Sequence, residues 1–354
     1  MAQAILAMIG LGLLAMVLWR DRGPIGELAS RRPDLRILAS SLLLTQVNLF
    51  LVFGRWAILV RVLDRRISVR TSILLGFIGC YFNLLIPGAV GGDVVKAAYL
   101  ARMQIKRAQA IASMIMDRVL GLLGLLVLTA IAGFLAWGPA TIEIRRLILA
   151  AWAMLGGGLF LITMLFVRVP LWNFAVWASG RQSRWSNIAS ELRAISSTYR
   201  QRPGVTVLGL ILSLLSHGLT VVVFFTLGKA LFGATMAATL GDHFLMVPLT
   251  LLTTAVPLPF GALGLTEEVG SHLLGMVGHP SGAVAMMGLR VLMITCGLEG
   301  ACVYLLRLKE LGNLTEAAGD LPTTVTSKQP VDQEKMHPRF ANPGPSLPVL
   351  RNSV

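Results

Sequence analysis

Eight long stretches without charge run through this chain and limit what it can fold into. They cover residues 1–19, 37–54, 71–92, 119–142, 147–167, 205–228, 244–266 and 282–306, the last interrupted only by Arg290 and Glu299. A helix of about 20 apolar residues crosses the roughly 30 Å of hydrocarbon in a bilayer. Charged residues make up 14% of the chain and mean hydropathy is +0.74, whereas soluble domains carry about 25% charge. The sequence therefore predicts an all-α polytopic membrane protein, because backbone polar groups in lipid are satisfied within helices.

The first stretch, residues 1–19, is predicted to be a retained transmembrane helix, with a cleaved signal peptide as the alternative. No Lys or Arg precedes it and no clear small-x-small cleavage site follows it, and a signal peptide has both. The formal net charge of +14 arises in short loops beside apolar stretches, where basic residues set topology and meet anionic lipid headgroups. Nucleic-acid binding is therefore not expected.

Two apolar stretches are interrupted in the same way, 172 residues apart. Residues 85–93 read LIPGAVGGD and residues 257–265 read PLPFGALGL. One ungapped shift of 172 places Pro87 on Pro259, Gly92 on Gly264 and Arg118 on Arg290. Interrupted hydrophobic segments at matching places in two halves are typical of transporters with internal repeats. The sequence predicts a re-entrant or broken helical hairpin in each half, and the alternative is two kinked helices packed through small residues.

Loop charges predict that the two halves are inverted. Basic residues cluster at 55–70, 96–118 and 168–202, and the positive-inside rule places all three clusters in the cytoplasm. Residues 71–107 must then enter and leave on one side, and residues 234–277 form a second hairpin entered from the other. The repeat halves are about 37–142 and 205–306, and both termini are cytoplasmic. The basic loop 20–36 conflicts with this arrangement, which places it outside.

Two further segments have a different composition. Residues 169–203 alternate Trp with Arg and carry a helical apolar stripe, which predicts an amphipathic helix in the membrane interface; a helix facing water is the alternative. Residues 309–354 are rich in Pro, Ser, Thr and Asn, which predicts a disordered cytoplasmic tail. Residues 1–308 form the predicted integral membrane domain.

Charged residues beside the two interruptions form the candidate site. Arg118 and Arg290 lie inside apolar stretches, where an arginine is costly unless it faces a cavity or a partner. Amides of a glycine turn that runs into a helix bind anions, and an arginine adds bidentate recognition of phosphate. We therefore expect a phospholipid headgroup here, with carboxylates contacting a cationic group on it. The candidate substrate-binding residues are Asn83, Gly88, Gly91, Gly92, Asp93, Lys96, Arg118, Gly261, Gly264, Glu267, Glu268 and Arg290.

Structural roles are the alternatives for both arginines. Arg118 would extend to the cytoplasmic interface and pair with its neighbour Asp117. Arg290 would pair with Glu267 or Glu268 and lock the second hairpin. Asn83 would only satisfy backbone groups freed by the helix break.

Other residues carry weaker signals. We interpret Arg55 and Trp56 as an interface anchor rather than a ligand contact. His217 is interpreted as a helix-packing residue, and His243, His272 and His279 lack metal-ligand spacing. A Walker A sequence, His-Glu-x-x-His and Gly-x-Ser-x-Gly are all absent from the sequence, so the motifs give no reason to expect catalytic residues, a metal or a cofactor.

At these residues the chain resembles the lysylphosphatidylglycerol synthase transmembrane region, also called flippase-like integral membrane proteins. The matching pieces are Arg55 with Trp56, residues 83–97 (NLLIPGAVGGDVVKA), residues 107–118 (RAQAIASMIMDR) and residues 259–290. The resemblance implies a bacterial inner-membrane protein that moves a phospholipid or lipid-linked molecule between leaflets.

The chain departs from the family in three ways. Thr266 precedes Glu267 where the family often has a basic residue, and Lys96 stands where an arginine is common. The aminoacyltransferase domain of larger relatives is absent from this sequence, so lysyl-lipid synthesis is not supported.

The predicted function is lipid translocation, with a headgroup held between the inverted repeats. Arg118 and Lys96 would bind phosphate from the cytoplasmic side, and Arg290 with Glu267 would form the outer half of the site. Two alternatives stay open: an accessory protein that recruits a separately encoded synthase or glycosyltransferase, and a lipid-modifying enzyme with Asp93 or Glu267 as general base. The expected partners are the lipid substrate and anionic membrane lipids, and a homodimer is one alternative for the oligomeric state.

Overall fold

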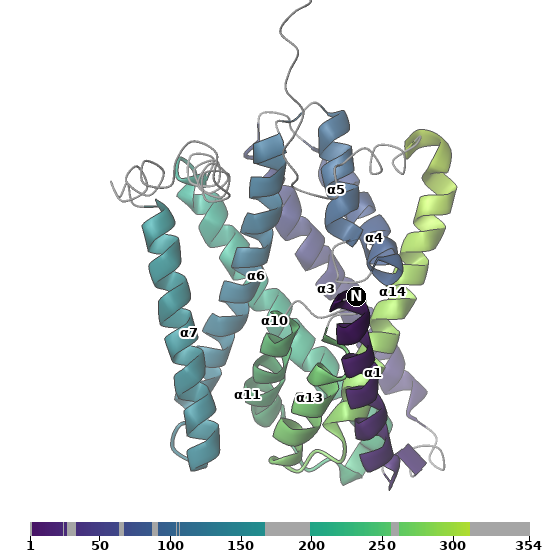
Figure 1. Cartoon of the computed structure of the whole chain (residues 1–354), viewed down its shortest axis with the longest axis vertical. Coiled ribbons are helices and arrows are strands. Elements are labelled where there is room, and N and C mark those ends of the chain that lie inside the picture. The colour runs from purple at the N-terminus through teal and green to yellow at the C-terminus, as the bar shows by residue number, and fades with distance from the viewer. Residues whose placement is uncertain are drawn as a thin grey trace, which may run out of the picture.

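The computed structural model describes nine ranges of the chain (Figure 1). They are residues 2–23, 25–26, 33–63, 67–86, 91–103, 105, 107–166, 199–255 and 262–311. Within these ranges the regular elements are all helices, as the sequence predicts. The tail from 312, most of the 169–203 linker, and Pro87, Gly88, Pro259 and Gly261 lie outside the described residues.

Four helices in each half follow one another in the same order. In the first half these are α3 (Leu35–Val60), α4 (Val69–Leu85), α5 (Gly91–Arg102) and α6 (Arg107–Leu135). In the second half they are α10 (Pro203–Phe232), α11 (Leu240–Leu251), α13 (Leu265–Gly275) and α14 (Gly282–Leu311). Short 3₁₀ turns lie at Gly233–Thr235 (η1) and Leu252–Ala255 (η2). A shift of 172 places each helix of the first half over its counterpart to within a few residues.

Two helices lie outside this correspondence. Helix α1 (Ala2–Arg20) packs against α13, and α7 (Ile142–Phe166) packs against α6. The α1 helix corresponds to the predicted first transmembrane segment. The uncharged stretch 119–142 lies mostly within α6, which begins at Arg107 and ends at Leu135.

Four of the described helices are long and apolar enough to cross a membrane. They are Leu35–Val60, Gln109–Leu135, Pro203–Thr235 and Gly282–Arg307. The helices α4, α5, α11 and α13 are 11 to 17 residues long, which is short for a crossing that needs about 20 residues. The long helices therefore supply the candidate crossings, and the short ones pack beside them.

The break in the 71–92 stretch follows from its glycines. Helix α4 ends at Leu85 and α5 begins at Gly91. A Cβ atom built on Gly91 would lie 2.1 Å from the carbonyl oxygen of Phe82, and one on Gly79 would lie 3.0 Å from Cα of Gly92. The two short helices therefore approach so closely that only glycine fits at Gly91 without a shift of backbone.

The short helices lie at opposite ends of the molecule. We call α4 and α5 the first helix pair, and α11 and α13 the second helix pair. The first pair occupies the upper half of Figure 1 and the second the lower half. Each pair also packs on the last long helix of the other half, since α4 contacts α14 and α11 contacts α6. The halves are therefore interlocked rather than placed side by side.

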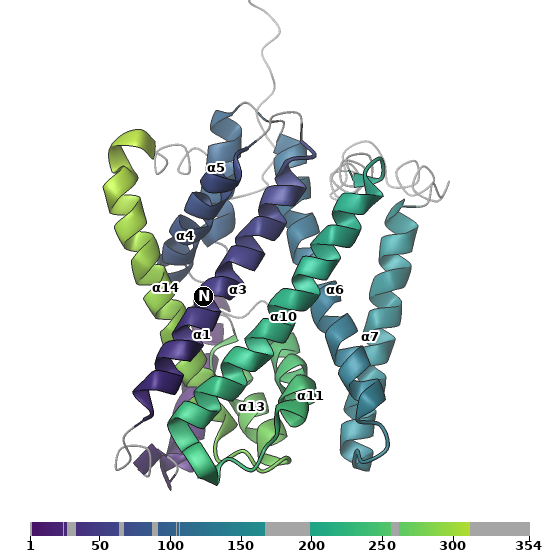
Figure 2. The same cartoon turned by 180° about the vertical axis from the view of Figure 1, so that it is seen from behind.

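Helices α3 and α10 add a further contact between the halves. Figure 2 shows them lying side by side along the molecule. Asn48 on α3 donates a hydrogen bond to the hydroxyl of Thr220 on α10 at 2.9 Å, and these residues are 172 positions apart. Matching positions of the two halves thus meet at this crossing.

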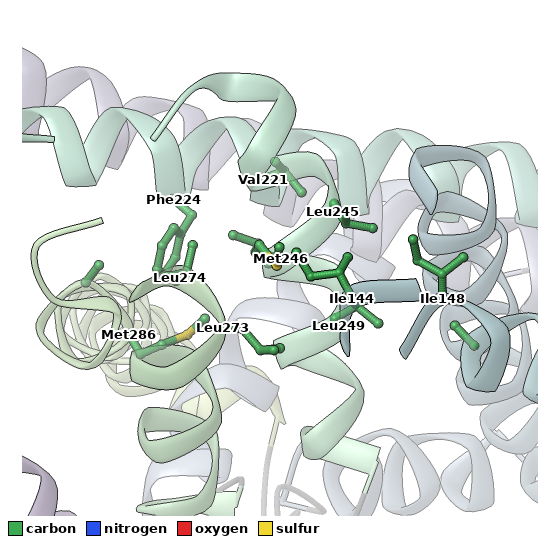
Figure 3. Packing of buried hydrophobic residues seen from close by; sticks show 13 residues of the cluster. Ile144, Ile148, Val221, Phe224, Leu245, Met246, Leu249, Leu273, Leu274 and Met286 are labelled. Atoms are coloured by element: carbon green, nitrogen blue, oxygen red, sulfur yellow. The ribbon is translucent and has the colours of Figure 1, made fainter. Parts of the chain in front are cut away.

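The second helix pair rests on a large apolar cluster (Figure 3). Its buried members come from four parts of the chain: α7, α10, the second helix pair and α14. They include Ile144, Ile148, Val221, Phe224, Leu245, Met246, Leu249, Leu273, Leu274 and Met286. Between membrane helices such packing stabilises mainly through van der Waals contact, since lipid is as apolar as these side chains.

Candidate functional site

The first ion pair joins the first helix pair to α6. Asp93 lies in the first turn of α5, and Arg118 lies in the interior of α6. Arg118 donates from Nε and Nη2 to Oδ2 of Asp93, at 2.8 and 2.5 Å. Their side chains are 55% and 28% exposed for Arg118 and Asp93 respectively. The pair is therefore accessible at the surface of the protein.

Asn83 fixes the turn beside this ion pair. Its Oδ1 accepts a hydrogen bond of 2.8 Å from the backbone N–H of Gly92. This is the structural alternative for Asn83: the side chain satisfies an amide freed by the helix break. That amide is consequently engaged and is not available to an anion.

Lys96 contacts Trp56, a contact that the sequence did not predict. The Lys96 ammonium lies 4.7 Å from the ring centroid of Trp56, a cation–π distance. Trp56 and Arg55 are both buried within the protein. The interpretation of Arg55 and Trp56 as an interface anchor is therefore wrong.

Arg55 forms an ion pair with Asp117. The sequence had suggested Asp117 as a partner for its neighbour Arg118. Nε of Arg55 donates to Oδ1 of Asp117 at 2.8 Å, and Nη1 donates to the hydroxyl of Ser213 at 3.1 Å. The neighbours Asp117 and Arg118 on α6 thus face different helices. The alternative in which they pair with each other is wrong. The pairing of Arg55 with Asp117 was not predicted from the sequence, because 62 residues separate them.

The second ion pair joins the second helix pair to α14. Arg290 donates from Nε to Oε1 of Glu267 and from Nη2 to Oε2 at 3.3 Å. Oε2 of Glu267 also accepts the backbone N–H of Gly264 at 2.7 Å. The Glu267 side chain is 0% exposed and that of Arg290 is 26% exposed. The predicted structural role of Arg290 is present, and the partner is Glu267 rather than Glu268.

Helix α1 covers this second ion pair from one side. Arg20 at its end donates to Oε1 of Glu268 at 2.9 Å. Asp21 accepts hydrogen bonds from the hydroxyls of Ser281, at 2.5 Å, and Ser271, at 3.4 Å. A Cβ atom on Gly264 would lie 2.2 Å from the carbonyl oxygen of Gly10. Sequence reasoning did not predict that α1 packs here, since 248 residues separate Arg20 from Glu268.

The candidate residues therefore form two groups, not one. Asn83, Gly91, Gly92, Asp93, Lys96 and Arg118 gather at the first helix pair, and Gly264, Glu267, Glu268 and Arg290 gather at the second. Gly88 and Gly261 lie outside the described residues. Within the described ranges, no group of three His, Cys, Asp or Glu residues is placed to hold a metal.

These features define a class of protein: a multi-pass helical membrane protein with an arginine–carboxylate pair beside each of two short-helix pairs. The sequence matches the family described as "Lysylphosphatidylglycerol synthase TM region" over residues 5–295. The chain belongs to this family, which associates it with membrane lipid metabolism or transport. No curated protein and no solved structure matches the chain.

Proposed function

We propose that this protein translocates a phospholipid or a lipid-linked molecule between the two leaflets of the bacterial inner membrane. One observation carries the proposal. Arg118 and Arg290, 172 residues apart, each pair with a carboxylate at the start of the short helix that follows an interruption. Two equivalent basic positions, one in each half, suit a ligand that is passed from one side to the other.

The proposed architecture is an inverted repeat, in which the two helix pairs are hairpins that open to opposite faces. Three observations support it. The helix pairs lie at opposite ends of the molecule (Figure 1), each packs on the last helix of the other half, and Asn48 meets Thr220 at the crossing of α3 and α10. Alternating access then consists of movement of each hairpin against the long helix it contacts.

The proposed orientation follows from the same arrangement. The end of α3, the end of α5, the start of α6 and the start of α10 lie at the upper end of the molecule in Figure 1. The described parts of the three basic clusters therefore gather at one end, which the positive-inside rule assigns to the cytoplasm. The chain's C-terminal helix α14 also ends there. The first ion pair then belongs to the cytoplasmic half of the site.

Exchange of ion-pair partners provides the proposed binding step. A phosphate oxygen of the headgroup displaces Asp93 from Arg118, forming charge-assisted hydrogen bonds. Asp93 is then available for a cationic or hydroxyl group of the same headgroup. One pairing replaces another, so the arginine is not left without a partner, which would be costly away from water. The acyl chains stay in the bilayer throughout.

The test is translocation by the purified full chain in liposomes that contain headgroup-labelled lipids of several classes. We expect Arg118→Ala to slow movement by about tenfold or more, because hydrogen bonds to a charged group contribute about 1.5–3 kcal/mol. For the second ion pair, the double variant Glu267→Gln with Arg290→Ala removes the cation without leaving a buried carboxylate unpaired.

Arg145→Ala is the matched control. Arg145 lies on α7, donates to the backbone carbonyls of Trp137 and Gly138, and belongs to neither ion pair. It should leave the rate unchanged. Parental rates in both the Arg118 and the Glu267–Arg290 variants would contradict the proposed site. Absence of movement for every lipid class by the parent protein would instead favour the accessory role.

A further inference from the structure

Two histidines from different parts of the second half lie side by side in the folded protein. His243 lies on α11 and His279 lies in the turn before α14. Their ring centroids are 5.5 Å apart, and the residues are 0% and 4% exposed, respectively. The two rings therefore pack edge to face in the protein interior.

Three ring nitrogens of this histidine pair have no hydrogen-bond partner. Nδ1 of His243 lies 2.7 Å from the carbonyl oxygen of Thr239, so this nitrogen carries the proton and Nε2 keeps a lone pair. Nε2 of His243 and both ring nitrogens of His279 make no hydrogen bond. The backbone of Ser281 lies close to the His279 ring, but the two groups do not have the geometry of a hydrogen bond. A buried polar atom without a partner calls for an explanation, and a bound water or ion is one.

A thioether lies beside the histidine pair. A Cβ atom built on Gly228 of α10 would lie 2.7 Å from Sδ of Met236 and 3.0 Å from Nε2 of His279. Both atoms are therefore close to the same point next to α10, where a side chain larger than hydrogen would displace them. The buried Met236 and His279 thus lie next to each other, and the ring of His243 lies on the ring of His279.

We propose that His243, His279 and Met236 bind a single copper(I) ion. Imidazole and thioether are ligands that select soft copper(I) among the common metals. Metal–nitrogen bonds of about 2 Å put each ring centroid roughly 3 Å from the ion, so two rings at a trigonal site lie roughly 5.5 Å apart. The observed separation of 5.5 Å is compatible with that arrangement.

The surroundings favour one positive charge over two. Asp242 is the carboxylate that acts on His243, and its Oδ2 already accepts from the backbone and hydroxyl of Thr239. Lys229 adds a positive charge nearby, with its ammonium 5.7 Å from the ring of Phe225. A divalent ion in this apolar site would be poorly compensated.

The rings around the histidines suit a single charge. Phe224, Phe225 and Phe232 have centroids 5.2–6.1 Å from one or other imidazole. Aromatic faces stabilise a nearby cation. Burial disfavours a charged imidazole, so the ring of His279 stays neutral and can act as a ligand.

The experiment measures copper(I) binding to the purified full chain in detergent, under reducing conditions and in competition with a colorimetric copper(I) chelator. The chain has three free cysteines, Cys80, Cys296 and Cys302, which also bind copper(I). All variants are therefore made in a parent with these three residues changed to Ser. We expect one ion per chain, and X-ray absorption that reports two nitrogen ligands and one sulfur ligand.

Two ligand variants and one control decide the outcome. His279→Ala and Met236→Leu should each weaken copper(I) binding by more than about tenfold, since even indirect partners of metal ligands contribute 10- to 100-fold. His272→Ala, on the exposed face of α13, should bind as the parent does. Met236→Leu preserves an apolar residue of similar size, so it reports on binding even where His279→Ala does not fold. The proposal is overturned if the cysteine-free parent protein binds no copper(I). It is also overturned if the ligand variants bind copper(I) as well as that parent does. Either result would indicate buried water beside His243 and His279. Lipid translocation plays no part in the measurement.

Discussion

The two ion pairs occupy matching places in the chain but very different surroundings. Arg118 is 55% exposed beside an accessible Asp93, whereas Arg290 is 26% exposed and holds a fully buried Glu267. The second pair also fixes the amide of Gly264 and lies under α1. Matching sequence positions therefore form one exposed ion pair and one covered ion pair. A protein that alternates access would show this difference in any one of its conformations.

The largest expected effect is on stability and separates the two arginines. Arg290→Ala leaves the Glu267 carboxylate buried without its partner, which destabilises by about 3–5 kcal/mol. Arg118→Ala removes an exposed pair and should cost about 1 kcal/mol or less. Denaturant unfolding of both variants in the same detergent compares them. The double variant Glu267→Gln with Arg290→Ala should recover part of the loss, and equal losses for the two single variants would refute the contrast between open and covered pairs.

A second prediction compares Gly92 and Gly264, the matching glycines near the starts of α5 and α13. Gly264 has φ +84°, and a Cβ atom there would meet the carbonyl oxygen of Gly10. Gly264→Ala should therefore destabilise by about 1–3 kcal/mol from backbone strain, before the clash is counted. At Gly92 the nearest atom to an added Cβ is 3.2 Å away, and its φ is not among the positive values. Gly92→Ala should shift the melting temperature less than Gly264→Ala, and the reverse order would contradict this account of α1.

A third prediction addresses the cover over the second pair. Arg20→Ala removes the ion pair with Glu268. The side chains of Arg20 and Glu268 are both partly exposed. The loss should be about 1 kcal/mol or less, with faster hydrogen exchange at the amides of α13 as the local readout. Exchange in α5 should not change. Acceleration in both helices would indicate general loosening instead of release of α1.

The smallest expected effect is at Lys96. Lys96→Met removes the cation–π contact with Trp56 but keeps a long apolar side chain against its ring, so we expect a loss of about 0.5–1 kcal/mol. Stability should change little and Trp56 fluorescence should shift. Under the proposed function, lipid movement should slow more than stability falls. A variant with parental translocation would remove Lys96 from the phosphate site and leave Arg118 there alone.

Part of this site could be predicted because its signals are local. Clustered Pro and Gly favour a break in a helix, so the interruptions near residues 87 and 259 and the matching positions of Arg118 and Arg290 were readable from the chain. The role of Asn83 was also foreseen as an alternative, since amides freed by a break need a nearby acceptor. Two amides of the glycine turns are not free, because those of Gly92 and Gly264 donate hydrogen bonds to Asn83 and Glu267.

The sequence by itself determined the helical membrane class, the two interruptions at matching positions and the placement of Arg118 and Arg290 within apolar helices. All three depend on the order of neighbouring residues. Only the tertiary structure decided which charges pair: Asp117 with Arg55, Glu268 with Arg20 and Glu267 with Arg290. An ion pair needs atoms within about 4 Å, and helices far apart in the chain reach that distance only through packing. The same packing placed α1 over one pair, buried it, and left the other open.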